Sequence, residues 1–102
     1  MTRVRAYVAR FTEEAAARVR KLHPDVKKHI RAGIDRIRGS PFDGHPLQDD
    51  LAGLRSLRVG GHRVVYRVQE TSRTLDIILV GSRRDIYEEL RDRVLRDIEP
   101  TP

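Results

Sequence analysis

The chain has 102 residues, the size of one ordinary domain, and we expect a single domain over residues 1–102. It carries 21 Lys and Arg against 15 Asp and Glu, and the formal net charge of +6 favours a polyanionic partner. It has no cysteine, which excludes disulfides and thiolate metal sites, and no apolar stretch near the roughly 20 residues of a membrane span, so we expect a cytoplasmic protein with no membrane partner.

The first part of the chain predicts one strand and two helices. Residues 3–10 alternate loosely between apolar and polar side chains, which favours a strand. Thr12 is a suitable N-cap for a short amphipathic helix that ends at His23. Pro24 suits the first turn of a second helix, and Gly39 is a suitable stop for it. The two helices together predict a helical hairpin.

The second part of the chain predicts three strands in succession. A loop rich in Pro, Gly and Asp covers residues 40–50, and a short strand follows at residues 55–59. Gly60-Gly61 predicts a tight turn in which both positions can need positive φ. Beyond the turn, an alternating strand covers residues 62–69, and a nearly continuous apolar strand, typical of the centre of a sheet, covers residues 75–80.

The order of these elements defines the expected fold class. An apolar stripe predicts a last helix over residues 85–98, so the order is β-α-α-β-β-β-α. We therefore expect an α+β fold with a mainly antiparallel, four-stranded sheet, the helical hairpin on one face and a C-terminal helix. Alternation along the strands places Arg58, Arg63 and Arg67 on the other face.

The sequence shows no metal or cofactor motif. Its histidines have no ligand spacing with carboxylates, and no glycine-rich phosphate loop precedes a helix. We therefore expect no metal and no cofactor.

Arginines at strand positions are the remaining candidates for chemistry. Arg58 and Arg63 flank the glycine turn, and Arg83 lies just past the end of the neighbouring strand. Tyr87 follows one helical turn beyond Arg83. Like charges so close repel each other unless an anion lies between them, and a phosphodiester is the natural candidate. The alternative, which the residues leave open, is that each arginine pairs with a surface carboxylate.

Three segments of the chain resemble the RelE/ParE superfamily of toxins from toxin–antitoxin modules. The resemblance begins with the run GLRSLRVGGHRVVY at residues 53–66, in which a glycine turn precedes an Arg-hydrophobic-hydrophobic-Tyr strand. It continues through the apolar strand at residues 75–80 and the run GSRRDIY at residues 81–87. With the two-helix N-terminal half, the resemblance covers nearly the whole chain, and we favour the RelE-like branch.

This resemblance implies a microbial-RNase-like fold and an activity. RelE-type members enter the ribosomal A site and cut messenger RNA without a metal, by attack of the ribose 2′-OH on the adjacent phosphate. Carried over by position, Arg58 and Arg63 contact the scissile phosphate, Arg83 stabilises the transition state or aids the leaving oxygen, and Tyr87 orients the nucleotide. The further arginines expected to bind RNA are Arg55, Arg67 and Arg84.

The sequence departs from the family pattern at three positions. Ser56 replaces a cation, His62 replaces an aromatic residue, and Ser82 replaces a histidine. The identity of the general base is therefore open. Histidine has the ordinary pKa that suits a general base, but alternation places His62 on the face of Val64 and Tyr66, away from Arg63.

The resemblance leaves the target open and implies a partner protein. A ParE-like inhibitor of DNA gyrase, with no catalytic activity, is the first alternative, and a decayed toxin that serves only as a co-repressor is the second. In every case we expect a cognate antitoxin, and the toxin–antitoxin hetero-oligomer is expected to bind operator DNA through the antitoxin. The endoribonuclease adds the ribosome and messenger RNA as partners.

Overall fold

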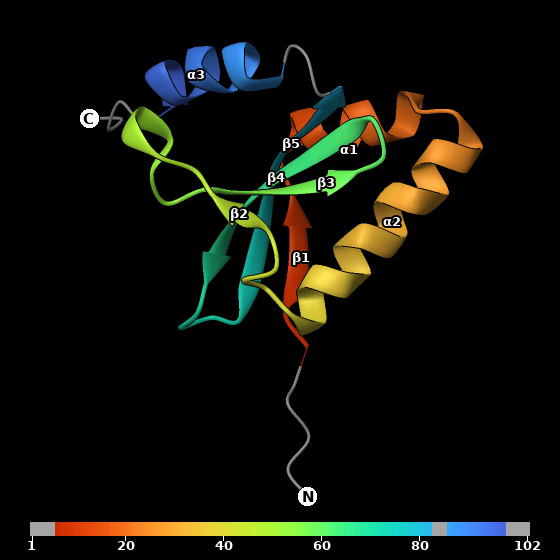
Figure 1. Ribbon diagram of the computed structural model, residues 1–102, viewed down its shortest axis with the longest axis horizontal. Coiled ribbons are helices and arrows are strands. Elements are labelled where there is room, and N and C mark those ends of the chain that lie inside the picture. The colour runs from red at the N-terminus through yellow and green to blue at the C-terminus, as the bar shows by residue number, and fades with distance from the viewer. Residues whose placement is uncertain (1–5, 83–85, 98–102) are drawn as a thin grey trace, which may run out of the picture.

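The computed structural model describes residues 6–82 and 86–97, with side chains up to residue 92. Its elements, in chain order and with the labels of Figure 1, are β1 (Val8–Phe11), α1 (Glu13–Lys21), α2 (Pro24–Gly39), β2 (His45–Pro46), the short 3-10 helix η1 (Asp49–Leu51), β3 (Arg55–Val59), β4 (His62–Gln69), β5 (Thr74–Ser82) and α3 (Ile86–Asp97). Within the described residues, no helix is long and apolar enough to cross a membrane.

The predicted α+β class is confirmed, and the sheet has one strand more than predicted. Its order is β1-β5-β4-β3-β2, with β3, β4 and β5 as an antiparallel meander and β1 parallel to β5. The fifth strand is β2, in which His45 and Pro46 pair with β3 inside the segment predicted as a loop. Two residues are too few to show the alternation that predicts a strand.

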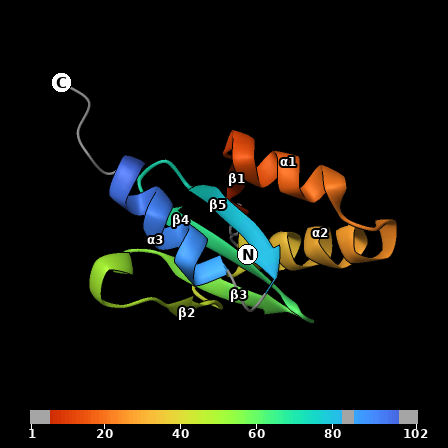
Figure 2. The same ribbon diagram turned by 90° about the horizontal axis from the view of Figure 1, so that it is seen from above.

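The helices divide between the two faces of the sheet. Figure 2 shows α1 and α2 on one side, hereafter the hairpin face, and α3 on the other, hereafter the α3 face. Thr12 caps α1 by accepting a hydrogen bond from the Ala15 amide at 3.1 Å, and Pro24 opens α2, as predicted. The sequence did not predict which face the C-terminal helix covers, and α3 packs on the face to which alternation assigned Arg58, Arg63 and Arg67.

Each face has its own apolar cluster. The hairpin face buries the larger one, which is formed by Tyr7, Ala15, Val19, Ile30, Ile34, Ile37, Leu57, Val64, Tyr66, Leu75, Ile77 and Val80. The α3 face buries the smaller one, which is formed by Leu51, Leu54, Val65, Leu79, Ile86 and Leu90.

A β-bulge between β4 and β5 determines which residues of β5 face each apolar cluster. Val65 pairs with Leu79 but Tyr66 pairs with Ile77, so one residue of β5 is skipped in a β-bulge. The bulge turns Ile77 and Leu79 to opposite faces, which explains why this strand is apolar nearly throughout.

The predicted glycine turn joins β3 and β4. Of the two turn glycines, Gly60 alone has a positive φ, at 58°, so one of the two positions uses the conformational freedom that the sequence allows at both. The turn still sets the register of the two strands that carry the candidate site.

Candidate nucleic-acid interface

Two arginines face each other across the β3–β4 hairpin. Arg58 and Arg63 are register partners in the antiparallel ladder. Directly opposite residues project from the same face of a sheet, and this pair shares its parity with Ser56 and Val65, on the α3 face. Like charges opposite each other in a ladder repel and lower stability, and an anion bound between them would offset that repulsion.

Neither arginine has a carboxylate partner among the described residues. Arg58 is exposed, and its one hydrogen bond within the described part of the chain is a long one of 3.5 Å from Nε to the Gly60 carbonyl. Arg63 is half-buried, and its Nε is buried without a hydrogen-bond partner in the described part of the chain. A buried donor without an acceptor is costly, so this face has hydrogen-bonding capacity that an incoming anion can use.

Arginines elsewhere in the molecule behave differently. Five are paired with carboxylates, one within α2 (Arg38–Asp35) and four between segments farther apart in the sequence (Arg10–Asp76, Arg18–Glu89, Arg36–Asp43 and Arg91–Asp50). The alternative in which every arginine is neutralised on the surface therefore does not hold for Arg58 and Arg63.

Tyr87 extends from α3 onto the same surface. Its ring centroid lies 5.8 Å from the guanidinium carbon of Arg63, within the range of a cation–π contact. Its hydroxyl donates a hydrogen bond to Ser56 Oγ at 3.3 Å, and Ser56 is fully buried. The α3 face therefore brings together Arg58, Arg63 and Tyr87, with Ser56 beneath the tyrosine. The sequence marked Ser56 only as a departure from the family pattern, and its contact with Tyr87 was missed.

Two of the predicted RNA-binding arginines are described, and they lie apart from each other. Arg67 is exposed and shares the parity of Arg63 on β4. Arg55 shares the parity of Leu57, on the hairpin face. Its Nε and Nη2 donate to the carbonyls of Gly44 at 3.1 Å and Phe42 at 3.0 Å, and its guanidinium lies over the Phe42 ring. Arg55 thus secures the loop before β2 and does not join the arginine pair.

The other predicted residues lie away from the pair or outside the described residues. His62 is on the hairpin face, where it lines a hollow of about 230 Å³ with Val26 and His29 of α2. This agrees with the alternation, which places the side chain of His62 on the face of the sheet opposite to that of Arg63. Arg83 and Arg84 belong to residues 83–85, which the structure does not describe. The described residues contain no group of three or more metal-ligating side chains.

A buried tyrosine supports the hairpin from the opposite face. The Tyr66 hydroxyl donates to the Pro41 carbonyl at 2.7 Å and accepts from the Gly44 amide at 3.0 Å. Burial raises the pKa of Tyr66 above its ordinary value, and the hydrogen bond from Gly44 opposes that rise in part. A Cβ at Gly44 would lie 2.6 Å from the Tyr66 hydroxyl, so this close approach requires glycine.

Comparison with known proteins places the chain among toxins. It matches the family model of the ParE toxin of the type II toxin–antitoxin system parDE over residues 5–87. Toxin RelG of Mycobacterium tuberculosis is 36% identical over 83 residues, which are 79% of this chain and 95% of RelG.

Solved structures agree with that family. A chain of the M. tuberculosis toxin–antitoxin complex RelBE2 superposes with a TM-score of 0.71 at 31% identity, over 76% of this chain and 99% of that one. The isolated RelE toxin of E. coli superposes with a TM-score of 0.69 at 26% identity, over 87% of this chain and 99% of RelE. The chain therefore belongs to the ParE toxin family of type II toxin–antitoxin systems, within the RelE/ParE superfamily.

Proposed function

We propose that this toxin is a ribosome-dependent messenger RNA endoribonuclease. The observation that carries the proposal is the Arg58–Arg63 pair, two facing guanidinium groups that have no carboxylate partner among the described residues. A phosphodiester gains negative charge on its oxygens as it passes through a phosphorane, and cations held in place beforehand stabilise that state most. The similarity to RelG and RelE toxins supports the same conclusion.

In the proposed reaction the ribose 2′-OH attacks the adjacent phosphorus. The bond from phosphorus to the 5′ oxygen breaks, which leaves a 2′,3′-cyclic phosphate and a 5′-OH. The proton of the 2′-OH passes to a base, and the departing oxygen takes up a proton. Arginine keeps its proton at neutral pH, so Arg58 and Arg63 act as electrostatic contacts to the phosphate and not as the base.

The remaining roles follow the family resemblance. Tyr87 orients the nucleotide, and its ring offers a surface for stacking on an unpaired base. Arg83 stabilises the transition state or aids the leaving oxygen. Arg67 and Arg84 add contacts to the RNA backbone. His62 lies on the hairpin face, so positioning and electrostatics, completed by the ribosome, account for the rate in this proposal.

A cognate antitoxin is the protein partner in this proposal. The RelBE2 structure from M. tuberculosis, which is similar to this chain, is that of a toxin–antitoxin complex. The net charge of +6 suits a partner with acidic segments, and binding of the toxin–antitoxin hetero-oligomer to operator DNA is assigned to the antitoxin.

Mapping the 5′ ends of ribosome-bound messenger RNA after induction tests the proposal. The wild-type chain should create new ends inside coding regions, and the double variant Arg58→Ala/Arg63→Ala should not. Arg20 is an exposed arginine on α1. The variant Arg20→Ala is therefore the control for loss of a positive charge, and it should cut messenger RNA like the wild type. Toxicity without new ends would reject the ribonuclease.

Gyrase inhibition is the second candidate function. It is favoured by the family model, which describes a ParE toxin, and by Ser56, which stands where ribonuclease members carry a cation. In a supercoiling assay, a gyrase inhibitor would block the reaction at stoichiometric toxin, whereas the endoribonuclease would leave supercoiling unchanged.

A further inference from the structure

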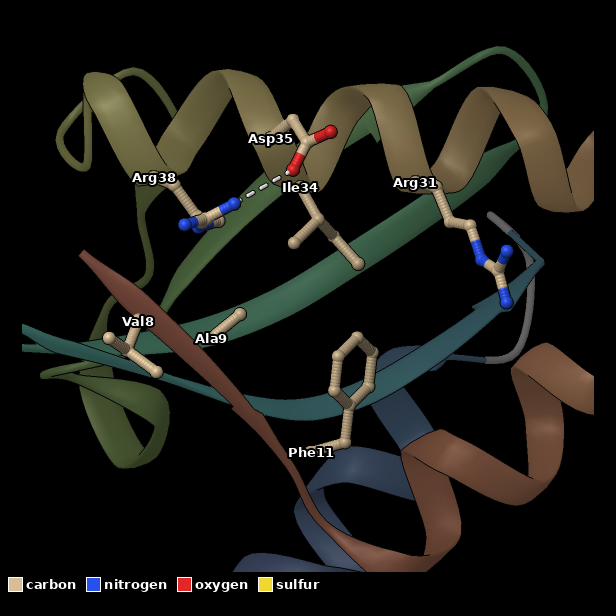
Figure 3. Close-up of a pocket in the computed structure, with 7 residues that line it drawn as sticks. All are labelled: Val8, Ala9, Phe11, Arg31, Ile34, Asp35 and Arg38. Carbon is tan, nitrogen blue, oxygen red and sulfur yellow. Dashed lines mark hydrogen bonds and ion pairs between the residues drawn. The ribbon is translucent and has the colours of Figure 1, made fainter. Parts of the chain in front are cut away.

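One ion pair joins helices that lie on opposite faces of the sheet. Arg18 of α1 pairs through Nη2 with the Glu89 carboxylate of α3, and both side chains are half-buried. No other ion pair among the described residues links the two faces in this way. Arg38–Asp35, for example, lies within α2 beside a hollow of about 430 Å³ between β1 and α2 (Figure 3). To reach Glu89, the side chain of Arg18 therefore extends past the sheet.

The outer edge of β5 is open where this side chain passes. β1 ends at Phe11, whose register partner on β5 is Ile77, so no described strand pairs with the outer edge of β5 beyond that point. α1 packs against β5, and Figure 2 shows β5 between α1 and α3. The last residues of β5 can therefore be reached from the hairpin face, around the edge of the sheet.

Gly81, near the end of β5, has no side chain, and Arg18 lies where one would extend. A Cβ at Gly81 would be 3.4 Å from Arg18 Nη1 and 3.6 Å from the side chain of Ile86 on α3. Gly81 is the register partner of Arg63, and directly opposite residues project from the same face of a sheet. The guanidinium of Arg18 thus lies on the face of the arginine pair, although α1 covers the other face.

This position places Arg18 in line with the arginine pair. Arg58 on β3 is opposite Arg63 on β4, and Arg63 is opposite Gly81 on β5. Neighbouring strands are about 4.8 Å apart, so Arg18, lying over Gly81, is the next cation in the row after Arg63. The row therefore contains three guanidinium groups, two carried by the sheet and one supplied by α1.

Arg18 retains hydrogen-bond donors for a further ligand. A guanidinium has five N–H groups, and Glu89 is bound through Nη2 alone. Within the described part of the chain, Nη1 and Nε of Arg18 donate no hydrogen bond, and the side chain is 39% exposed. Glu89 offsets part of the charge of Arg18, so Arg18 should contribute less to anion binding than Arg63, which has no carboxylate partner there.

We propose that Arg18 is a third phosphate-binding residue of the RNA site, supplied by α1 around the edge of β5. Its Nη1 donates to the phosphate adjacent to the one held by Arg58 and Arg63. No local sequence pattern indicates this role, because α1 covers the opposite face of the sheet. The inference rests on the proposed function in one respect, the assignment of the arginine pair to a phosphate of messenger RNA.

Titration with a trinucleotide of 2′-O-methyl RNA, which has no free 2′-OH and cannot be cut, tests the contact without a ribosome. In arginine side-chain NMR spectra, the Nε–H signals of Arg18 and Arg63 should shift together, while that of Arg20, an exposed arginine of the same helix, should not. A shift of Arg63 without Arg18, or an equal shift of Arg20, overturns the role of Arg18 and leaves the pair intact. If neither Arg18 nor Arg63 shifts, the pair is rejected as well.

Two variants that break the same ion pair separate a binding role from a structural one. Arg18→Gln removes the cation and should slow cleavage on ribosomes about tenfold under single-turnover conditions. Glu89→Gln removes a negative charge beside the phosphate and should cut at least as fast as the wild type. Equal losses in both variants would show that the pair is only structural, and a wild-type rate for Arg18→Gln would show that Arg18 does not contact the RNA. Either result contradicts the inference.

The two experiments also distinguish this inference from the proposed function. A wild-type chain that cuts no messenger RNA on ribosomes rejects the endoribonuclease, and the titration then decides on Arg18 by itself. A wild-type chain that cuts, together with an Arg18→Gln variant that cuts equally fast, rejects only the role of Arg18.

Discussion

The hairpin face and the α3 face of the sheet receive their residues from the same strands, by alternation, yet they differ in what is left unsatisfied. On the hairpin face, Tyr66 and Arg55 hold the loop before β2 through hydrogen bonds to backbone groups. On the α3 face, Arg58 and Arg63 lie opposite each other without a carboxylate among the described residues, and a buried Nε has no acceptor there.

This difference places satisfied polar groups on one face of the sheet and unsatisfied charges on the other. The hairpin face gains its stability from apolar burial and satisfied polar groups. The α3 face has a smaller cluster and retains two like charges opposite each other, whose repulsion lowers stability. Substitutions on the two faces should therefore affect different measurements.

The largest effect on stability is expected in the core of the hairpin face. Ile77 is fully buried there, and Ile77→Ala should lower the free energy of unfolding by about 2–5 kcal/mol. Leu90→Ala, in the smaller cluster, should cost less because α3 can shift to fill the space. Urea denaturation of both variants measures the difference, and equal costs would remove the contrast between the two faces.

The next effect concerns the buried tyrosine. Tyr66→Phe leaves the Gly44 amide and the Pro41 carbonyl without their partner and should cost about 1–3 kcal/mol. Because burial raises the pKa of Tyr66 in the folded state, its stabilisation is complete below the unfolded pKa of about 10 and is lost as the pH rises further. Denaturation at pH 7 and above pH 10 should show the gap between wild type and Tyr66→Phe narrowing, and a constant gap would contradict this.

A smaller effect is expected at the contact between Ser56 and Tyr87. A double-mutant cycle of Ser56→Ala and Tyr87→Phe should give a coupling energy of about 0.5–1.5 kcal/mol, the worth of one hydrogen bond. Thermal or chemical denaturation of the four proteins measures it. If the effects of the two substitutions on the free energy of unfolding are additive, Ser56 of β3 does not hold Tyr87 in place.

The smallest effect on stability is expected at the arginines of the site. Arg63→Ala loses a cation–π contact but relieves a buried donor, so its stability should stay within about 1 kcal/mol of the wild type. Arg83→Ala should also fold normally. Both variants should nevertheless lose toxicity when expressed, and full toxicity of both would reject the phosphate-site assignment.

Local sequence patterns were enough to predict most of the fold. Helical periodicity, the Thr12 cap and the glycine turn each act within a few residues, so the helical hairpin and the meander could be predicted from them. The two-residue β2 could not, because it is held by β3 and by the hydrogen bonds of Tyr66, which come from far along the chain.

The site was predictable only where strand alternation decides. Alternation alone placed Arg58 and Arg63 together and His62 apart. The contacts of Arg55 depend on how a distant loop folds back, which no local pattern reveals. One residue does indicate where α3 packs. Val65 is an apolar residue between two arginines on that face, and its burial requires another apolar element to pack against it.

Cleavage of a defined messenger RNA on purified ribosomes measures the role of the arginine pair most directly. Under single-turnover conditions, Arg58→Ala/Arg63→Ala should cut at least about 100-fold more slowly than the wild type, while Arg20→Ala should match it. Folding of each variant is checked beforehand by its unfolding transition. Equal cleavage rates for the folded double variant and the wild type would contradict the assignment of this pair to the scissile phosphate.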